Sequence, residues 1–282
     1  MRQRVHASGG GEEGRKAHSV PGIQYRVVWN QREGIDGEFS FTLTIHQHGG
    51  QRRLAASTRR CGHSEDMFVM SKGHCVETLY AVLAEKGFFP IEQVIKEYSQ
   101  FGSKFIGHPN NKLPGIEMNS GSLGHGLPVA VGMALAQKMD KRPSRTYVVM
   151  GDGELAEGSV WEGTMSATQY KLDNLCAVVD RNRLQISGTT EEVMHQDSVE
   201  ARFAAFGWNI ISVDGNDIDA MNAAFDGAKT VKGKPTLIVA NTTKGKGSTV
   251  MEDKAGWHHH VPTAEEYDQI IADLKAHEKE AL

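Results

Sequence analysis

Residues 147–153 read Tyr-Val-Val-Met-Gly-Asp-Gly, an apolar run that ends in a turn carrying one carboxylate. A short apolar run bounded by glycine predicts a buried strand, so Asp152 is expected where that strand ends. A second apolar run, residues 175–179, is followed by Asp180-Arg181-Asn182. About one helix separates the two runs, which predicts parallel neighbouring strands with Asp152 and Asn182 at the same sheet edge.

The same alternation of helix and strand patterns extends from Met67 to the end of the chain. Continuous apolar strands separated by helices favour an α/β fold, with a parallel sheet covered by helices on both faces. We therefore expect residues 66–282 to form one domain. Helices are predicted at 77–86, 127–139, 158–170 and 218–230, further strands at 208–213 and 235–240, a loop from 86 to 126, and a solvated helix in the charged tail 264–282.

The first 65 residues have a different character, with glycine clusters and scattered arginines. Only residues 39–45 have a convincing strand pattern there. Residues 1–65 are therefore interpreted as a divergent N-terminal segment with no assigned place in the fold.

Composition excludes several functional classes. The chain has 31 basic and 35 acidic residues and a net charge of −4, which gives no long-range attraction for nucleic acid or acidic membranes. Its three cysteines form no CxxC pair, so neither a zinc site nor a disulfide framework is indicated. No apolar run approaches the ~18 residues of a membrane span, and we predict a cytoplasmic protein.

The two polar strand ends suggest a cation site. The Asp152 carboxylate, the Asn182 amide oxygen and the main-chain carbonyl of Leu184 are the hard oxygen ligands that Mg²⁺ prefers, with Ca²⁺ or Mn²⁺ as alternatives. The N–H of Gly153 and the helix that follows can face phosphate oxygens. An isolated Gly-Asp-Gly is equally compatible with a plain tight turn, but Asn182 at the end of the next strand favours a site for a diphosphate held through a cation.

Further motifs occur together with this pair: Ser-Lys-Gly-His at 71–74, Gly-His-Pro at 107–109, Ser-Gly-Ser-Leu-Gly-His-Gly at 120–126, Gly-Asp-Gly-Glu-Leu-Ala-Glu-Gly at 151–158 and Trp-His at 257–258. In order and approximate spacing they resemble the motifs of transketolases, which use thiamine diphosphate. The resemblance covers roughly residues 66–262. It corresponds to the diphosphate-binding half only, like the N-terminal subunit of the split, two-chain form.

The resemblance implies roles for individual residues. It assigns Asp152, Asn182 and the Leu184 carbonyl to the metal. His74, His108 and His258 match active-site histidines, of which His74 and His258 also approach the diphosphate. Cofactor contacts are further implied for Gly121, Ser122, Leu123, Gly153, Glu157 and, besides its role at the metal, Asn182. Among these, Glu157 matches an acidic residue that links two cofactor sites across a subunit interface.

The implied activity is transfer of a two-carbon ketol unit from a ketose phosphate to an aldose phosphate, in the pentose phosphate pathway. Histidine suits the proton transfers of such a reaction near pH 7. The pyrimidine-binding domain that completes the family's site is missing, so the resemblance implies a C-terminal partner subunit in a heterotetramer, with self-association across the cofactor interface.

Two alternatives and one departure from the family pattern stay open. The same Gly-Asp-Gly and Asn pair occurs in α-subunits of 2-oxo acid dehydrogenases and in deoxyxylulose-phosphate-synthase-like enzymes. A subunit that binds cofactor without turnover is the other alternative. The family's early Ser-Gly-His-x-Gly-Gly segment has no convincing match in residues 1–65, and one hypothesis is a coding frame altered up to about Met67.

Overall fold

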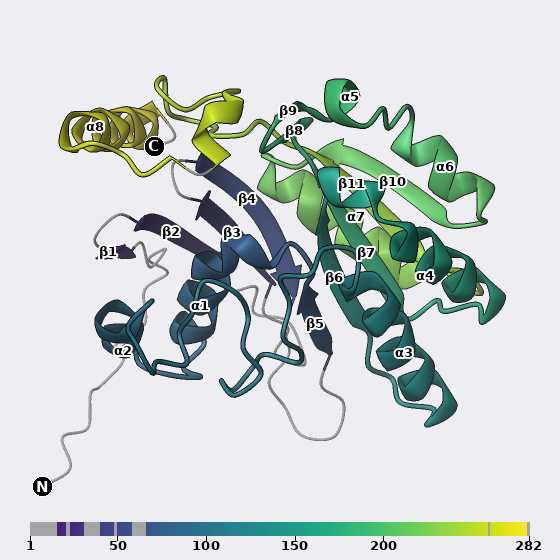
Figure 1. The fold of residues 1–282 in the computed structure, drawn as a ribbon. Coiled ribbons are helices and arrows are strands. Elements are labelled where there is room, and N and C mark those ends of the chain that lie inside the picture. Colours follow the sequence, from purple (N-terminus) through teal and green to yellow (C-terminus); the bar gives the residue numbers. More distant parts are fainter. Residues whose placement is uncertain are drawn as a thin grey trace, which may run out of the picture.

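A five-stranded parallel sheet forms the centre of the protein (Figure 1). The computed structural model describes residues 16–20, 23–30, 40–47, 50–57, 66–258 and 260–280, the first four ranges as backbone only. The sheet has the order β10-β11-β7-β6-β5, and every neighbouring pair is parallel. Its strands are β5 (Met67–Met70), β6 (Thr146–Gly151), β7 (Leu175–Arg181), β10 (Asn209–Asp214) and β11 (Thr236–Asn241).

Helices cover both faces of this sheet, because the side chains of a strand alternate between its two sides. Tyr147 and Val149 of β6 belong to the core under α1 (Val76–Glu85), α2 (Ile91–Glu97) and α7 (Ile218–Thr230). Val148 and Met150 belong to the core under α3 (Gly126–Met139), α4 (Gly158–Gln169) and α6 (Val199–Ala205). The predicted α/β fold with two covered faces is confirmed.

The predicted helices and strands from residue 77 onward lie within two residues of those observed, and α8 (Ala264–Glu280) forms most of the predicted terminal helix. The predicted loop from 86 to 126 was wrong in part, because it contains α2. That helix has seven residues and follows Pro90, and only Val94 of its side chains is buried, so its apolar period was too short to recognise. Strand β5, helix α6 and the short helix α5 (Thr190–Val193) were not predicted.

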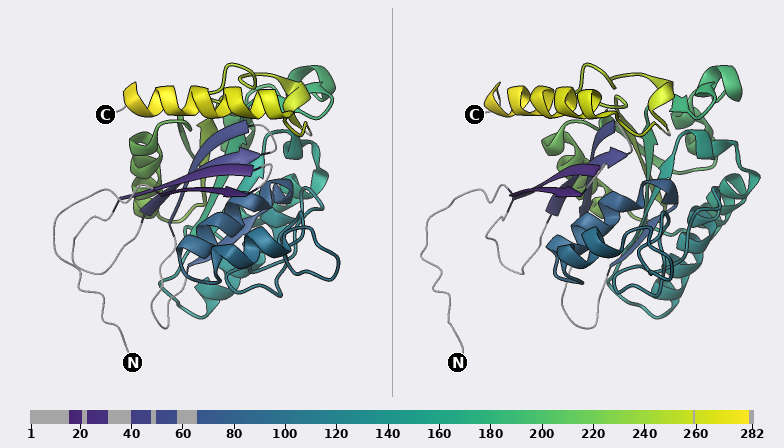
Figure 2. Two further views of the ribbon diagram at one scale, coloured as in Figure 1. Left: turned by 90° about the vertical axis from the view of Figure 1, so that its left-hand side faces the viewer. Right: turned by 60° about the vertical axis from the view of Figure 1, so that its left-hand side comes forward.

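Four antiparallel strands precede the central sheet along the chain and lie beside α1 (Figure 2). They are β1 (Lys16–Val20), β2 (Ile23–Asn30), β3 (Ser40–Gln47) and β4 (Gly50–Ser57). Strand β3 overlaps the one strand expected in this segment, at 39–45. The division of the chain at residue 65 stays a prediction.

Short elements complete the edge of the central sheet where its strands end. They are the hairpin of β8 (Leu184–Gln185) and β9 (Gly188–Thr189), and 3-10 turns at Gly73–Cys75, Gly153–Ala156 and Ala255–His258. In the described part of the chain no helix combines the length and apolarity that crossing a bilayer requires.

Candidate active site

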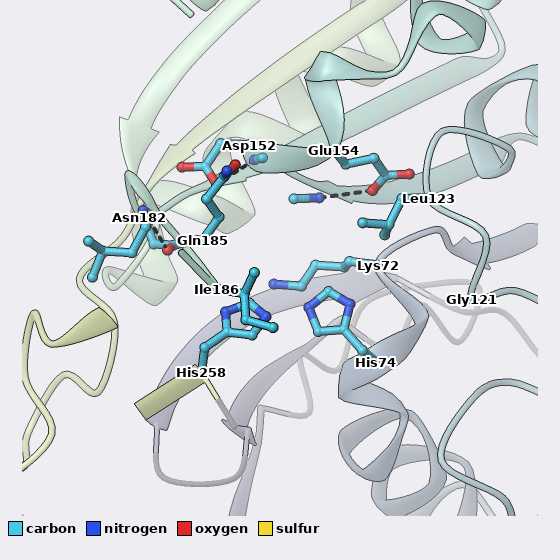
Figure 3. Close-up of a pocket in the computed structure, with 13 residues that line it drawn as sticks. Lys72, His74, Gly121, Leu123, Asp152, Glu154, Asn182, Gln185, Ile186 and His258 are labelled. Atoms are coloured by element: carbon cyan, nitrogen blue, oxygen red, sulfur yellow. Dashed lines mark hydrogen bonds between the residues drawn. The ribbon is translucent and has the colours of Figure 1, made fainter. Parts of the chain in front are cut away.

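A cavity of about 360 Å³ lies at the carboxyl edge of the central sheet (Figure 3). Strands β5, β6 and β7 are neighbours, so the segments that follow them meet there. Eight residues predicted from the sequence line this cavity: His74, Gly121, Leu123, Asp152, Gly153, Asn182, Leu184 and His258. Five further lining residues were not predicted: Lys72, Gly151, Glu154, Gln185 and Ile186.

Asp152 and Asn182 are both buried, with 3% and 5% of their surfaces exposed. The Asp152 carboxylate accepts hydrogen bonds from the backbone N–H of Gly153 at 2.8 Å and of Arg183 at 2.5 Å. The Asn182 side-chain oxygen accepts from the N–H of Leu184 at 3.1 Å. The N–H of Gly153, which was expected to face a phosphate, therefore points at Asp152 in this structure.

These oxygens form a donor set for a hard cation. An Asp carboxylate, an Asn amide oxygen and a main-chain carbonyl suit Mg²⁺ or Ca²⁺ rather than a thiophilic metal. Within the described ranges, no group of three or more His, Cys, Asp or Glu side chains is placed to hold a metal. Asp152 and Asn182 could therefore supply only part of a coordination shell.

A buried ion pair lies next to the cavity, and its lysine is one of the lining residues. Lys72, two residues after β5, contacts Asp180 near the end of β7 at 2.5 Å, and the two side chains are 2% and 0% exposed. The hydroxyl of Thr242, after β11, donates to the other oxygen of Asp180. Together with Thr242, the pair connects the carboxyl ends of β5, β7 and β11.

Glu154 is a second buried carboxylate, 2% exposed, in the turn after Asp152. Burial raises the pKa of Glu154 above its usual range, while hydrogen bonds from Ser71, Gly124 and Gly151 and the charge of Lys72 act in the opposite direction. Its sequence position gave no sign of these contacts, which depend on how the loops fold together.

Two of the predicted histidines stack on each other at the cavity wall. The rings of His74 and His258 lie 5.3 Å apart, centre to centre, with 29° between their planes. His74 lies in the 3-10 turn after β5, and His258 ends the 3-10 turn near the C-terminal helix. Figure 3 shows both rings on the side of the cavity opposite Asp152 and Glu154.

Three predicted residues lie outside the cavity wall: His108, Ser122 and Glu157 are exposed. The ring of His108 is close to it, because a Cβ built on Gly121 would come within 2.8 Å of His108 Cδ2. Ser122 lies between two lining residues. The side chain of Glu157 lies beside Gly124, where an added Cβ would be 2.5 Å from that of Glu157. His108 and Glu157 thus lie next to the loop that contains Gly121 and Gly124, and the roles of all three residues stay predictions.

Comparisons with known proteins identify the family of the chain. The family model for the transketolase, thiamine diphosphate binding domain matches residues 60–279. The chain belongs to this family. The chain is 53% identical over 209 residues to an apulose-4-phosphate transketolase subunit of Phocaeicola vulgatus, with 74% of each chain covered. It is 42% identical over 211 residues to a 6-deoxy-6-sulfo-D-fructose transketolase subunit of a Clostridium species, covering 74% of this chain and 76% of the relative.

Longer transketolases match over part of their length. Human transketolase is 43% identical over 210 residues, which are 74% of this chain and 33% of the relative. The structure of Pichia stipitis transketolase in complex with sedoheptulose 7-phosphate superposes with a TM-score of 0.70 at 37% identity, covering 75% of this chain and 33% of that one. The chain thus spans about a third of these relatives. The predicted transketolase family and transferase class, as well as the thiamine diphosphate-binding domain, are confirmed.

Proposed function

We propose that this chain is the diphosphate-binding subunit of a transketolase that moves a two-carbon ketol unit between sugar phosphates. The observation that carries the proposal is the meeting of Asp152, Asn182, His74 and His258 around one cavity, although they come from three distant parts of the chain. Family membership supports thiamine diphosphate as the ligand of this cavity.

The chain's own residues can hold that cofactor through a divalent cation. Asp152, the Asn182 side chain and the Leu184 carbonyl would bind Mg²⁺, with diphosphate oxygens and water as the remaining ligands. The loop with Gly121 and Leu123 would contact the rings, and Gly153 would approach the diphosphate. When bound, thiamine diphosphate supplies the carbanion chemistry of ketol transfer.

The histidines would handle protons and orient the sugar. His74 and His258 present two neighbouring imidazoles to the cavity, where they can donate hydrogen bonds to a sugar hydroxyl or a phosphate. His108 lies beside Gly121, which lines the cavity, and would contact the substrate from there. A neutral imidazole can accept a hydroxyl proton and return it, which is the proton transfer that this reaction needs.

A second chain would complete the site. The chain covers about a third of single-chain transketolases, and two relatives that it matches over most of their length are named as subunits. We expect the partner to carry the pyrimidine-binding domain, in a heterotetramer in the cytoplasm. The exposed side chain of Glu157 near the cavity is available for contact with another subunit.

The donor would be a ketose phosphate and the acceptor an aldose phosphate of the pentose phosphate pathway or of related sugar metabolism. The relatives named for apulose 4-phosphate and for 6-deoxy-6-sulfo-D-fructose indicate that modified ketoses belong in the same panel of candidates. The family match favours this proposal over a 2-oxo acid dehydrogenase or a deoxyxylulose-phosphate-synthase-like enzyme.

The experiment is reconstitution. The chain is purified together with a candidate C-terminal transketolase subunit, and thiamine diphosphate, Mg²⁺, a panel of ketose phosphates and ribose 5-phosphate are added. Mass spectrometry should detect an acceptor lengthened by two carbons, and the product should be absent with Asp152→Ala. Cofactor binding without any such product would instead favour a subunit that has lost turnover.

A further inference from the structure

Glu154 contacts three separate segments that build the cavity. Its Oε1 accepts hydrogen bonds from the hydroxyl of Ser71, after β5, and from the N–H of Gly124, before α3. Its Oε2 accepts from the N–H of Gly151, at the end of β6. The backbone nitrogen of Gly124 lies 2.8 Å from Oε1, and that of Gly151 lies 3.1 Å from Oε2. One buried carboxylate thereby joins two strand ends to the loop in front of a helix.

The network continues into helix α3. The oxygen of Ser71 accepts a hydrogen bond at 3.1 Å from the N–H of Gly126, the first residue of that helix. The approach requires glycine, because a Cβ on Gly126 would lie 2.3 Å from Ser71 Oγ. Ser71 therefore connects the first residue of α3 to Glu154 through two hydrogen bonds.

The loop that contains Gly121 and Gly124 needs unusual backbone angles. Gly121 and Gly124 have φ values of +135° and +84°, which favour glycine and leave the unfolded loop with large backbone freedom. Gly121 and Leu123 line the cavity, and the contact to Glu154 is made by the residue that follows Leu123. An anchor at Gly124 fixes the part of the loop that would touch a cofactor.

We propose that Glu154 is a positioning residue that sets the distance between the Gly121–Leu123 loop and the Gly-Asp-Gly turn, and thereby the fit of thiamine diphosphate. This inference rests on the proposed function, since it assumes that cofactor. Glu154 acts through Gly124 and Gly151 and is neither a cation ligand nor a proton carrier in this role. All three groups that contact the carboxylate donate hydrogen bonds to it, so both of its oxygens must act as acceptors.

The informative variant is Glu154→Gln, which keeps the size of the side chain. Glutamine offers one acceptor oxygen and two N–H donors, so at least one of the three donors would face another donor in a buried place. The matched control is Glu77→Gln. Glu77 is also buried and accepts a hydrogen bond from Tyr98, but it lies on α1 and does not line the cavity.

Two binding measurements test the role on the chain assembled with its partner subunit. Calorimetry should show a thiamine diphosphate Kd about tenfold higher for Glu154→Gln than for the wild type, as expected for loss of one charged hydrogen bond. For Glu77→Gln the Kd should stay within about twofold. Without cofactor, hydrogen exchange should speed up locally in Glu154→Gln at residues 120–126 and 150–153.

Kinetics separate positioning from catalysis. In Glu154→Gln the KM for thiamine diphosphate should rise while kcat at saturating cofactor stays within a few-fold of the wild type. A wild-type Kd together with wild-type exchange would overturn the inference, and so would a large loss of kcat with an unchanged Kd. If Glu154→Gln does not fold, Ser71→Ala removes one donor and should give a smaller rise in Kd with faster exchange at 120–126; unchanged values would count against the role.

Failure of the proposed function gives a different pattern. If the wild-type complex binds thiamine diphosphate but forms no sugar product, the Kd and exchange measurements still test the positioning role. If the wild type binds no thiamine diphosphate, the proposed function fails, and the inference about cofactor fit fails with it whatever the exchange shows.

Discussion

At the residue scale, the buried pair of Lys72 and Asp180 is a side-chain contact whose loss should be costly. Removing one partner leaves the other charge buried, which typically costs about 3–5 kcal/mol. Lys72→Met should therefore lower the free energy of unfolding by that amount, measured by urea denaturation of the full chain. Both side chains are almost fully buried, so water can do little to compensate.

A second variant at the same site separates charge from packing. Thr242→Val removes one hydroxyl that donates to the Asp180 carboxylate and should cost about 1.5–3 kcal/mol, less than loss of the ion pair. If Lys72→Met were no more damaging than Thr242→Val, the ion pair would not be the element that holds the three strand ends together.

Gly121 has a backbone conformation that favours glycine, and it also lines the cavity. Gly121→Ala places a side chain at a φ of +135° and 2.8 Å from the His108 ring, so it should cost about 1–3 kcal/mol of stability and also lower turnover. Thermal unfolding and steady-state rates of the assembled enzyme measure both effects. The control is Gly132→Ala on α3, where no atom lies within 4 Å of the new Cβ, with an expected gain of about 0.5–1 kcal/mol. Equal behaviour of the two variants would contradict the assignment.

The positions of single site residues were predictable from the sequence where these residues follow a clear strand pattern. Asp152 and Asn182 each follow an apolar run, so their meeting at one sheet edge was implied by the periodicity alone. Glu154 and Lys72 were not predictable, because their roles come from loops that meet only after folding. The family resemblance supplied His74 and His258, for which the sequence offered no geometric argument.

At the element scale, one carboxylate connects helix α6 to the sheet. Glu200 of α6 accepts two hydrogen bonds from Arg181 of β7, at 3.2 and 3.0 Å, and one from Ser212 of β10 at 3.3 Å. Partial burial would raise the pKa of Glu200, but its own backbone N–H, the charge of Arg181 and the nearby serine hydroxyls together lower it below 4.5. The ionised form is therefore the one that holds α6 in place.

This contact predicts a pH-dependent effect. Since the folded-state pKa of Glu200 is lowered, its contribution is present above pH 4.5 and is lost as the pH falls through the folded pKa. Glu200→Gln should cost about 0.5–1 kcal/mol at pH 7, because the pair is partly exposed. Urea midpoints of the wild type and the variant should converge below pH 4.5. Asp268→Asn, at an exposed position on α8, should show no such convergence.

Elements with strong periodicity were predictable, and weak ones were not. The buried strands β6 and β7 and the helices α3 and α7 have long apolar patterns that match their fold. Helix α2 and strand β5 are short, with seven and four residues, and tertiary contacts rather than local pattern define them.

At the scale of the whole molecule, the cavity is lined by segments that follow β5, β6 and β7 and by the turn that carries His258. His108, Ser122 and Glu157 are exposed and lie outside this lining. In the proposed assembly, a second chain would cover these side chains.

This arrangement predicts that cofactor stabilises the assembly more than it stabilises the single chain. A ligand that binds only the folded state at 100 times its Kd adds about 2.7 kcal/mol of stability. Thermal unfolding of the chain mixed with its partner should therefore shift upward with thiamine diphosphate and Mg²⁺, and a chelator should reverse the shift. The chain alone should shift much less, because in the proposed assembly the partner supplies the rest of the cofactor site, and Asp152→Ala should remove the Mg²⁺ dependence in the mixture. An equal shift without the partner would mean that one chain already forms the complete cofactor site.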